Sequence, residues 1–139
     1  MGDKNPQEEY RDSKLRHYTT GAIRSAEGEK FDVKGFLSPH AVEAYCAYMH
    51  EHRKLPNGTR RGSDNWKNGI DEADYERSLI RHAHDLHRAC EGAEVVDKDS
   101  GKVVTKQELV CAVVFNAMGL LHEWNKPKGM NPRKDYGEQ

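Results

Sequence analysis

The segment TKQELVCAVVFNAMGLLHEW, residues 105–124, constrains the fold more than any other part of the chain. Thr105 followed three positions later by Glu108 is the capping-box pattern of a helix N-terminus. From Leu109 to Leu121 no residue carries a charge, and apolar side chains fall on nearly every side of a helix. Because a helix that is hydrophobic all round is normally buried, the segment predicts the central helix of a bundle.

Two further helices are predicted from caps and apolar periodicity. Ser38-Pro39 is an N-cap followed by proline at the first helical position, and this helix should end before Pro56. Its apolar residues recur at helical spacing, at Ala41, Val42, Tyr45, Cys46 and Met49. The next helix begins near the acidic residues 71–74 and stops at Gly92. Its expected apolar stripe is Tyr75, Leu79, Ala83, Leu86 and Cys90.

The rest of the chain reads as termini and connections. Residues 1–15 are polar and predict a mobile terminus, and residues 126–139 predict a flexible tail. Residues 16–37 show no sustained periodicity, so we expect an extended arm laid on the domain. Residues 58–69 form a long, glycine-rich, basic loop. The fold class is therefore all-α, with an N-terminal arm and one long loop.

Composition limits the core and the partners. Hydrophobic residues make up 35% of the 139 residues and charged residues 32%, so we expect one modest core, concentrated in a few segments and completed by polar ends or by an oligomer interface. The three cysteines, Cys46, Cys90 and Cys111, are too few and too widely spaced for a disulfide framework, and we expect reduced thiols in the core.

A net charge of −1 gives no general attraction to nucleic acid or to an anionic membrane. No apolar run reaches the length of a bilayer span, and no signal-peptide core follows Met1. We therefore expect a soluble cytoplasmic protein with neither nucleic acid nor membrane as partner.

The run RHAHDLH in the second long helix places three histidines beside an aspartate. At 100° per residue from Tyr75, His82 lies at about 340° and Asp85 at about 280°, both on the flank of the apolar stripe. His84 lies at about 180° and His87 at about 120°, away from it. The spacing predicts that His82 and Asp85 point together into a cleft, whereas His84 and His87 face water.

Each candidate site residue also has a structural explanation. His82 could be a hydrogen-bonded, partly buried histidine, and Asp85 a surface ion-pair residue. Glu108 is a good magnesium ligand at the mouth of a cleft, but it could serve only the capping box. Asn116 is either a substrate-binding residue or an asparagine that bonds a neighbouring backbone group. A zinc site built from His84, His87 and Cys90 has suitable spacing, but Cys90 fits the apolar stripe better.

The basic loop offers groups suited to a nucleotide. Arg60, Arg61 and Lys67 can pair with phosphate, Trp66 offers a stacking face if it is exposed, and Asn65 can hydrogen-bond a base. A basic loop is usually only solvated, so the tryptophan is the more informative of these residues.

Taken in order, the segments RHYTTGAIRS, EGEKFD, LSPHAVEAY, SDNWKNG, LIRHAHDLHRACEG, DKDSG and ELVCAVVFNAMGLLHE resemble a known family. This is the phage-associated dATP/dGTP diphosphohydrolase family, a MazG-like group of nucleoside triphosphate pyrophosphohydrolases. The resemblance covers about residues 16–123, and the order and spacing of the segments carry it.

The resemblance implies a single MazG-like catalytic domain over residues 16–125, usually oligomeric, with a divalent-metal site of helix carboxylates. The implied reaction converts a deoxypurine triphosphate to a monophosphate and pyrophosphate. The broader MazG-like pattern has EExxE on one helix and ExxD on the next. Here Arg81, His82 and Asp85 stand at the first motif, and Glu108 and Cys111 at the second, so only Asp85 and Glu108 keep an acid.

From these residues we expect Asp85 and Glu108 to hold Mg²⁺ or Mn²⁺, with His82 as a further ligand or the general base. The expected catalytic residues are therefore His82, Asp85 and Glu108. The expected substrate-binding residues are Arg60, Asn65, Trp66, Lys67, Arg81 and Asn116. The substrate would be dATP or dGTP. The protein would be a dimer or tetramer in the cytoplasm, which would be the host cytoplasm if a phage encodes it.

Two other classes of function stay open. An HD-type phosphohydrolase would use the doublet His84-Asp85, but the third helix supplies no downstream aspartate. A non-enzymatic helical interaction protein of a phage would also suit the low apolar content. Release of pyrophosphate would indicate the MazG-like enzyme, and release of triphosphate or phosphate would indicate the HD-type enzyme. A chain that does not respond to nucleotides would be the non-enzymatic protein.

Overall fold

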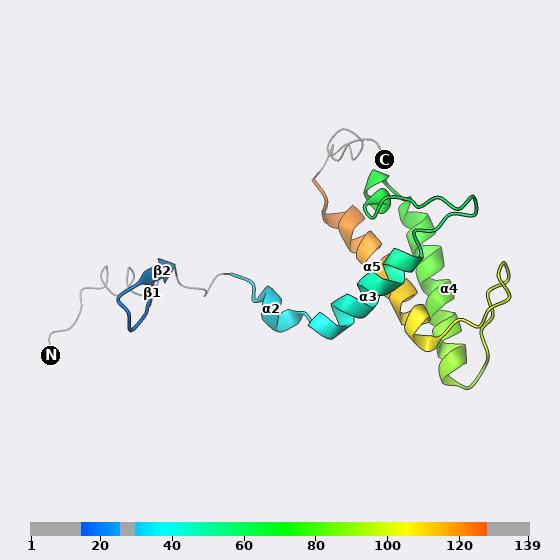
Figure 1. Ribbon diagram of the computed structural model, residues 1–139, viewed down its shortest axis with the longest axis horizontal. Helices are drawn as coiled ribbons and strands as arrows, with labels where there is room; N and C mark the ends of the chain where they lie inside the picture. Colours follow the sequence, from blue (N-terminus) through cyan, green and yellow to red (C-terminus); the bar gives the residue numbers. More distant parts are fainter. Residues whose placement is uncertain (1–14, 26–29, 128–139) are drawn as a thin grey trace. The chain divides into compact units, whose positions relative to one another are not determined.

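The computed structural model describes residues 15–25 and 30–127 (Figure 1). The predicted mobile terminus up to residue 14 and the predicted tail from residue 128 lie outside the described residues. The chain divides into two compact units, residues 1–41 and 42–139. The described residues are mostly helical, which confirms the all-α class in its coarse form.

The first unit contains an antiparallel hairpin and a single turn of helix. Strand β1, Leu15–His17, pairs with strand β2, Ile23–Ser25. Gly21 takes a φ of 86° in the connecting turn, a conformation that side chains other than glycine rarely adopt. Helix α2, Val33–Phe36, is capped by the Asp32 carboxylate, which accepts a hydrogen bond from the Gly35 N–H at 2.8 Å. The predicted arm therefore contains two short elements that its lack of periodicity concealed.

Helix α3, Pro39–Glu51, begins where the sequence predicts it. The Ser38 hydroxyl accepts a hydrogen bond from the Ala41 N–H at 3.2 Å, which confirms Ser38 as the cap. Beyond the helix, the chain turns back on itself, since the Leu55 N–H donates to the Thr59 carbonyl at 2.8 Å. The basic loop is thus a narrow turn followed by a short 3₁₀ helix, η1, Asn65–Asn68.

Helices α4, Glu72–Cys90, and α5, Lys106–Asn125, form an antiparallel pair in the second unit (Figure 1). The predicted capping box of α5 is confirmed. The Thr105 hydroxyl accepts from the Glu108 N–H at 3.1 Å, and the Glu108 carboxylate accepts from the Thr105 N–H at 3.3 Å.

The core of the second unit lies between α4 and α5. Tyr75, 1% exposed, packs edge-on against Phe115, with ring centroids 6.0 Å apart. A Cβ added at Gly119 would overlap the Tyr75 ring, so this glycine lets the two helices approach closely. At the other end of the pair, Ala89 and Leu109 pack with Val95.

Two predictions about the core are wrong. Ala83 and Cys90, expected in the stripe of α4, are exposed, and Ala89 is buried in their place. The buried side of α4 is turned away from the predicted stripe, toward the flank that carries His82. This is because α5 packs against that flank rather than against the most apolar line of α4. Cys46 is exposed as well, so among the three thiols only Cys111 is buried.

Candidate functional site

The inner flank of α4 carries polar side chains where a core helix would normally place apolar ones. His82 and Asp85 are half-buried, and the Asp85 side chain is 24% exposed. His84 and His87 are exposed, and His87 lies 3.6 Å from the Glu91 carboxylate. The division of the histidine run that helical spacing predicts is therefore present in the structure.

His82 is poorly solvated and incompletely bonded. Its Nδ1 is buried and has no hydrogen-bond partner among the residues that the structure describes. Burial and the neighbouring Arg81 charge lower the pKa of His82 below 6.5, and the Asp85 charge opposes this only in part. The imidazole is thus held in its neutral form near pH 7, which is the form that can accept a proton.

Asp85 and Arg81 stand at the accessible edge of the same flank. Asp85 Oδ1 lies 3.4 Å from Arg88 Nη1, one turn along the helix, at the long end of hydrogen-bond distances. Arg81 is exposed. The arrangement places a carboxylate and a guanidinium next to a neutral imidazole within about one turn of helix.

Glu108 faces a different part of the unit. A groove of about 550 Å³ separates the C-terminal half of α3 from the start of α5. Its lining residues are Ala44, Ala47, Tyr48, Glu51, His52, Thr105, Gln107, Glu108 and Cys111. The Glu108 carboxylate is engaged there by both the backbone and the hydroxyl of Thr105, at 3.3 and 3.1 Å. This is the structural role that the capping-box pattern left open.

The groove was missed by sequence reasoning. Burial, followed by the nearby Cys111 and Glu108, raises the pKa of Tyr48 to about 12. The His52 ring bonds through Nδ1 to the Tyr48 carbonyl oxygen at 2.8 Å, and Glu51 pairs with Lys54 at 2.9 Å. Glu51 and His52, an acid and a histidine at the end of α3, were the sequence feature that could have indicated this groove. Only the way α3 lies beside α5 brings them near the capping box.

The predicted metal ligands His82, Asp85 and Glu108 come from two helices, α4 and α5. Within residues 15–25 and 30–127, no group of three or more His, Cys, Asp or Glu side chains is arranged to hold a metal ion. His82 and Asp85 share one flank of α4, whereas Glu108 is held in its capping box at the groove.

Asn116 is buried, 6% exposed, and its Nδ2 donates to the Ala112 carbonyl at 2.8 Å. Its amide nitrogen thus bonds a backbone group of its own helix, which is the structural one of the two roles that the sequence left open for Asn116. A buried asparagine with such a partner costs less stability than one left without a partner.

The basic loop is anchored to α5 through its tryptophan. Trp66 is half-buried, and its ring meets His122 edge-on, with centroids 4.8 Å apart. Trp66 therefore does not meet the condition of full exposure under which it would offer an open stacking face, because its ring lies against His122 of α5. Lys67 Nζ lies 5.7 Å from the centroid of the same ring, and Asn65, also half-buried, begins η1.

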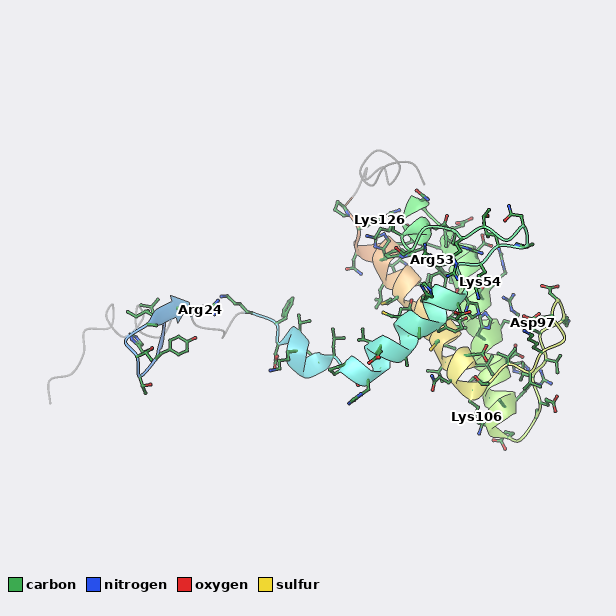
Figure 2. All side chains as sticks on the ribbon, in the orientation of Figure 1. Arg24, Arg53, Lys54, Asp97, Lys106 and Lys126 are labelled. Carbon is green, nitrogen blue, oxygen red and sulfur yellow. The ribbon has the colours of Figure 1, made fainter. Side chains whose placement is uncertain are left out.

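The arginines of this loop remain at the surface. Arg60 Nη1 lies 3.1 Å from His50 Nε2, and Arg53 Nε donates to the Arg61 carbonyl at 2.9 Å. Arg53 and Lys54 lie together where α3 gives way to the loop (Figure 2). The loop thus keeps exposed cationic groups on a backbone that is tied to α3.

No family model, curated protein or solved structure matches the chain. In the described ranges, no helix is both long and apolar enough to cross a membrane.

Proposed function

We propose that the protein is a metal-dependent nucleoside triphosphate pyrophosphohydrolase that cleaves dATP or dGTP to a monophosphate and pyrophosphate. The observation that carries the proposal is the inner flank of α4, where half-buried Asp85 stands beside His82, whose buried Nδ1 has no hydrogen-bond partner within residues 15–25 and 30–127. The order of the family-like segments supports the reaction class. An HD-type reading has less support because His84 is exposed.

The residues fit a metal only in part. Mg²⁺ is commonly bound through one or two carboxylates, with water and substrate phosphates completing its coordination, and Mn²⁺ also suits such oxygen ligands. Asp85 would hold the ion, with His82 as a second ligand or as the base. When bound, it would offset phosphate charge and lower the pKa of a coordinated water. Glu108 stays a proposed ligand only if it leaves the capping box.

The chain's own groups supply the remaining chemistry. His82, kept neutral by burial, accepts a proton from the water that attacks phosphorus. Water adds to one phosphoryl group, the bond between the α and β phosphates breaks, and pyrophosphate leaves. Arg81 and Arg60, both exposed, and Lys67 are suited to binding phosphates. Trp66 and Asn65 are suited to the base, and we assign Asn116 a structural role.

A nucleotide panel with Mg²⁺ or Mn²⁺ tests the reaction. We expect equal amounts of monophosphate and pyrophosphate from dATP or dGTP. Asp85→Asn and His82→Gln should each lower kcat by about 10²–10⁴. His84→Gln, a matched change on the exposed side of the same helix, should leave kcat unchanged.

Glu108→Gln separates the two roles of that residue, since glutamine also forms a capping box. If the Glu108→Gln variant keeps its stability but loses turnover, Glu108 is a metal ligand. If the variant keeps its turnover, Glu108 serves only the capping box. If both Asp85→Asn and Glu108→Gln keep full metal-dependent turnover, the assignment is wrong. Released triphosphate or phosphate would favour the HD-type chemistry, and no turnover or nucleotide-dependent thermal shift would favour a non-enzymatic protein.

A further inference from the structure

Helix α5 presents three sides, and two of them are covered. Leu109 and Gly119 face α4, where they pack near Ala89 and against Tyr75. Glu108 and Cys111 face α3 across the groove. The third side lies between these two contacts, opposite the core of the unit.

This third side is apolar and exposed along the length of the helix. Its exposed residues are Val110 at 45%, Val114 at 38%, Met118 at 48%, Leu121 at 56% and Trp124 at 60%. No charged residue interrupts the sequence from Leu109 to Leu121. A helix that is apolar on all sides normally has neighbours on all sides, so one neighbour of α5 is missing.

The residue spacing indicates the kind of neighbour. Val110, Val114, Ala117, Leu121 and Trp124 alternate steps of four and three, which is the heptad spacing of a helix that packs along another helix. The face carries no charge, so two copies of it meet without repulsion. Such a surface is self-complementary, as a two-fold symmetric contact requires.

We propose that the third side of α5 is a homodimer interface, at which it packs against α5 of a second copy of this chain. This inference does not depend on the nucleotide chemistry.

The area of the face fits this occupant. The exposed parts of its five large side chains amount to roughly 300–400 Å² per copy, by the usual areas of apolar and aromatic side chains. A standard interface buries about 800 Å² per partner, of which a little over half is apolar. The face therefore supplies most of the apolar centre of such an interface, and neighbouring polar residues would form its rim.

The small core of the second unit also supports a dimer interface. Among the described residues, the buried apolar side chains are Tyr75, Ala89, Val95, Leu109, Cys111, Ala112 and Leu120, and Tyr75 is the only aromatic one. Small cores generally leave little net stability, so a second apolar contact between copies would add usefully to this one.

Sedimentation velocity of the full chain tests the proposal. We expect the wild type to sediment as a dimer at micromolar concentration. Leu121→Glu buries a charge at the centre of the interface and should raise the dissociation constant at least about thirtyfold. Ile80→Glu is the matched control, because Ile80 is 70% exposed on α4 among polar neighbours, and it should leave the dimer intact.

Two further measurements keep the test decisive. If circular dichroism shows that Leu121→Glu does not fold, Met118→Lys, nearer the edge of the face, replaces it. In a Trp66→Phe background, acrylamide quenching of Trp124 should be weak in the dimer and stronger once Leu121→Glu separates the copies.

Three results would overturn the proposal. The first is a wild type that is monomeric at every concentration with Trp124 quenched freely. The second is a monomer with Trp124 protected, which would mean that residues of the same chain cover the face. The third is a dimer that survives both Leu121→Glu and Met118→Lys, which would place the interface elsewhere.

Discussion

At the scale of the residue, the environment of His82 on the inner flank of α4 departs clearly from that of a histidine in solution. Its buried Nδ1 lacks a hydrogen-bond partner in the described part of the chain, a situation that typically costs about 1–3 kcal/mol. The charged imidazolium is disfavoured further, because burial lowers its pKa below 6.5. A group kept under such conditions is a candidate for function, since an apolar residue would stabilise the same position.

The lowered pKa of His82 predicts a loss of stability in mild acid. The unfolded chain binds a proton at His82 near pH 6.5 and the folded chain only at lower pH, so protonation favours unfolding. The free energy of unfolding should therefore fall as the pH drops below about 6.5. Urea titrations at pH 7.5 and at pH 5.5 measure the difference.

His82→Leu should reduce this difference and raise the free energy of unfolding at pH 7.5 by about 1 kcal/mol. His84→Gln, at an exposed position, is the control and should keep the wild-type pH dependence. A pH dependence that is the same in His82→Leu and the wild type would show that other groups cause it.

At the scale of the element, the close approach of α4 and α5 depends on Gly119. In isolation, glycine weakens a helix by about 1 kcal/mol relative to alanine. Here the position adjoins the Tyr75 ring, and an added Cβ would overlap it. The ring cannot easily move, because it is 1% exposed and packed against Phe115.

Gly119→Ala should therefore destabilise the protein by about 1–3 kcal/mol, the usual cost of overpacking, despite the better helix propensity of alanine. Urea unfolding measures the change. Tyr75→Leu makes room for the methyl group, so the two substitutions together should cost less than the sum of their separate effects. A more stable Gly119→Ala variant would mean that the helices separate at no cost.

At the scale of the whole molecule, the exposed side of α5 links stability to association. The buried side chains of the second unit lie between α4 and α5 and at Val95 in the loop that joins them, and five large apolar side chains of α5 stay exposed in one copy. If the folded state is a dimer, unfolding also separates the copies, and stability depends on protein concentration.

The Tm of the wild type should then rise by a few degrees for each tenfold increase in protein concentration, because each step adds about 1.4 kcal/mol per dimer. Differential scanning calorimetry over a concentration series measures this. Leu121→Glu should show a lower Tm that does not change with concentration, whereas Ile80→Glu should follow the wild type. A wild-type Tm independent of concentration would contradict a dimeric folded state.

The sequence by itself determined the features that depend on neighbours within about one helical turn. Ser38 and the Thr105–Glu108 box set where α3 and α5 begin, because a cap is a bond across three residues. The division of the histidine run was also predictable, since helical spacing alone separates His82 from His84. The chemistry proposed for that flank still rests on its residue types and on the family resemblance.

Only the tertiary structure decided which part of the chain each face of a helix or loop packs against. Ala89 replaces Cys90 in the core because α5 packs against one flank of α4, and periodicity does not specify that flank. Trp66 turns inward because His122, far along the chain, lies beside it. Glu108 lines the groove beside α3 because α3, distant in sequence, lies next to the start of α5. Contacts between residues distant in sequence depend on how whole helices pack, and local patterns carry no information about that packing.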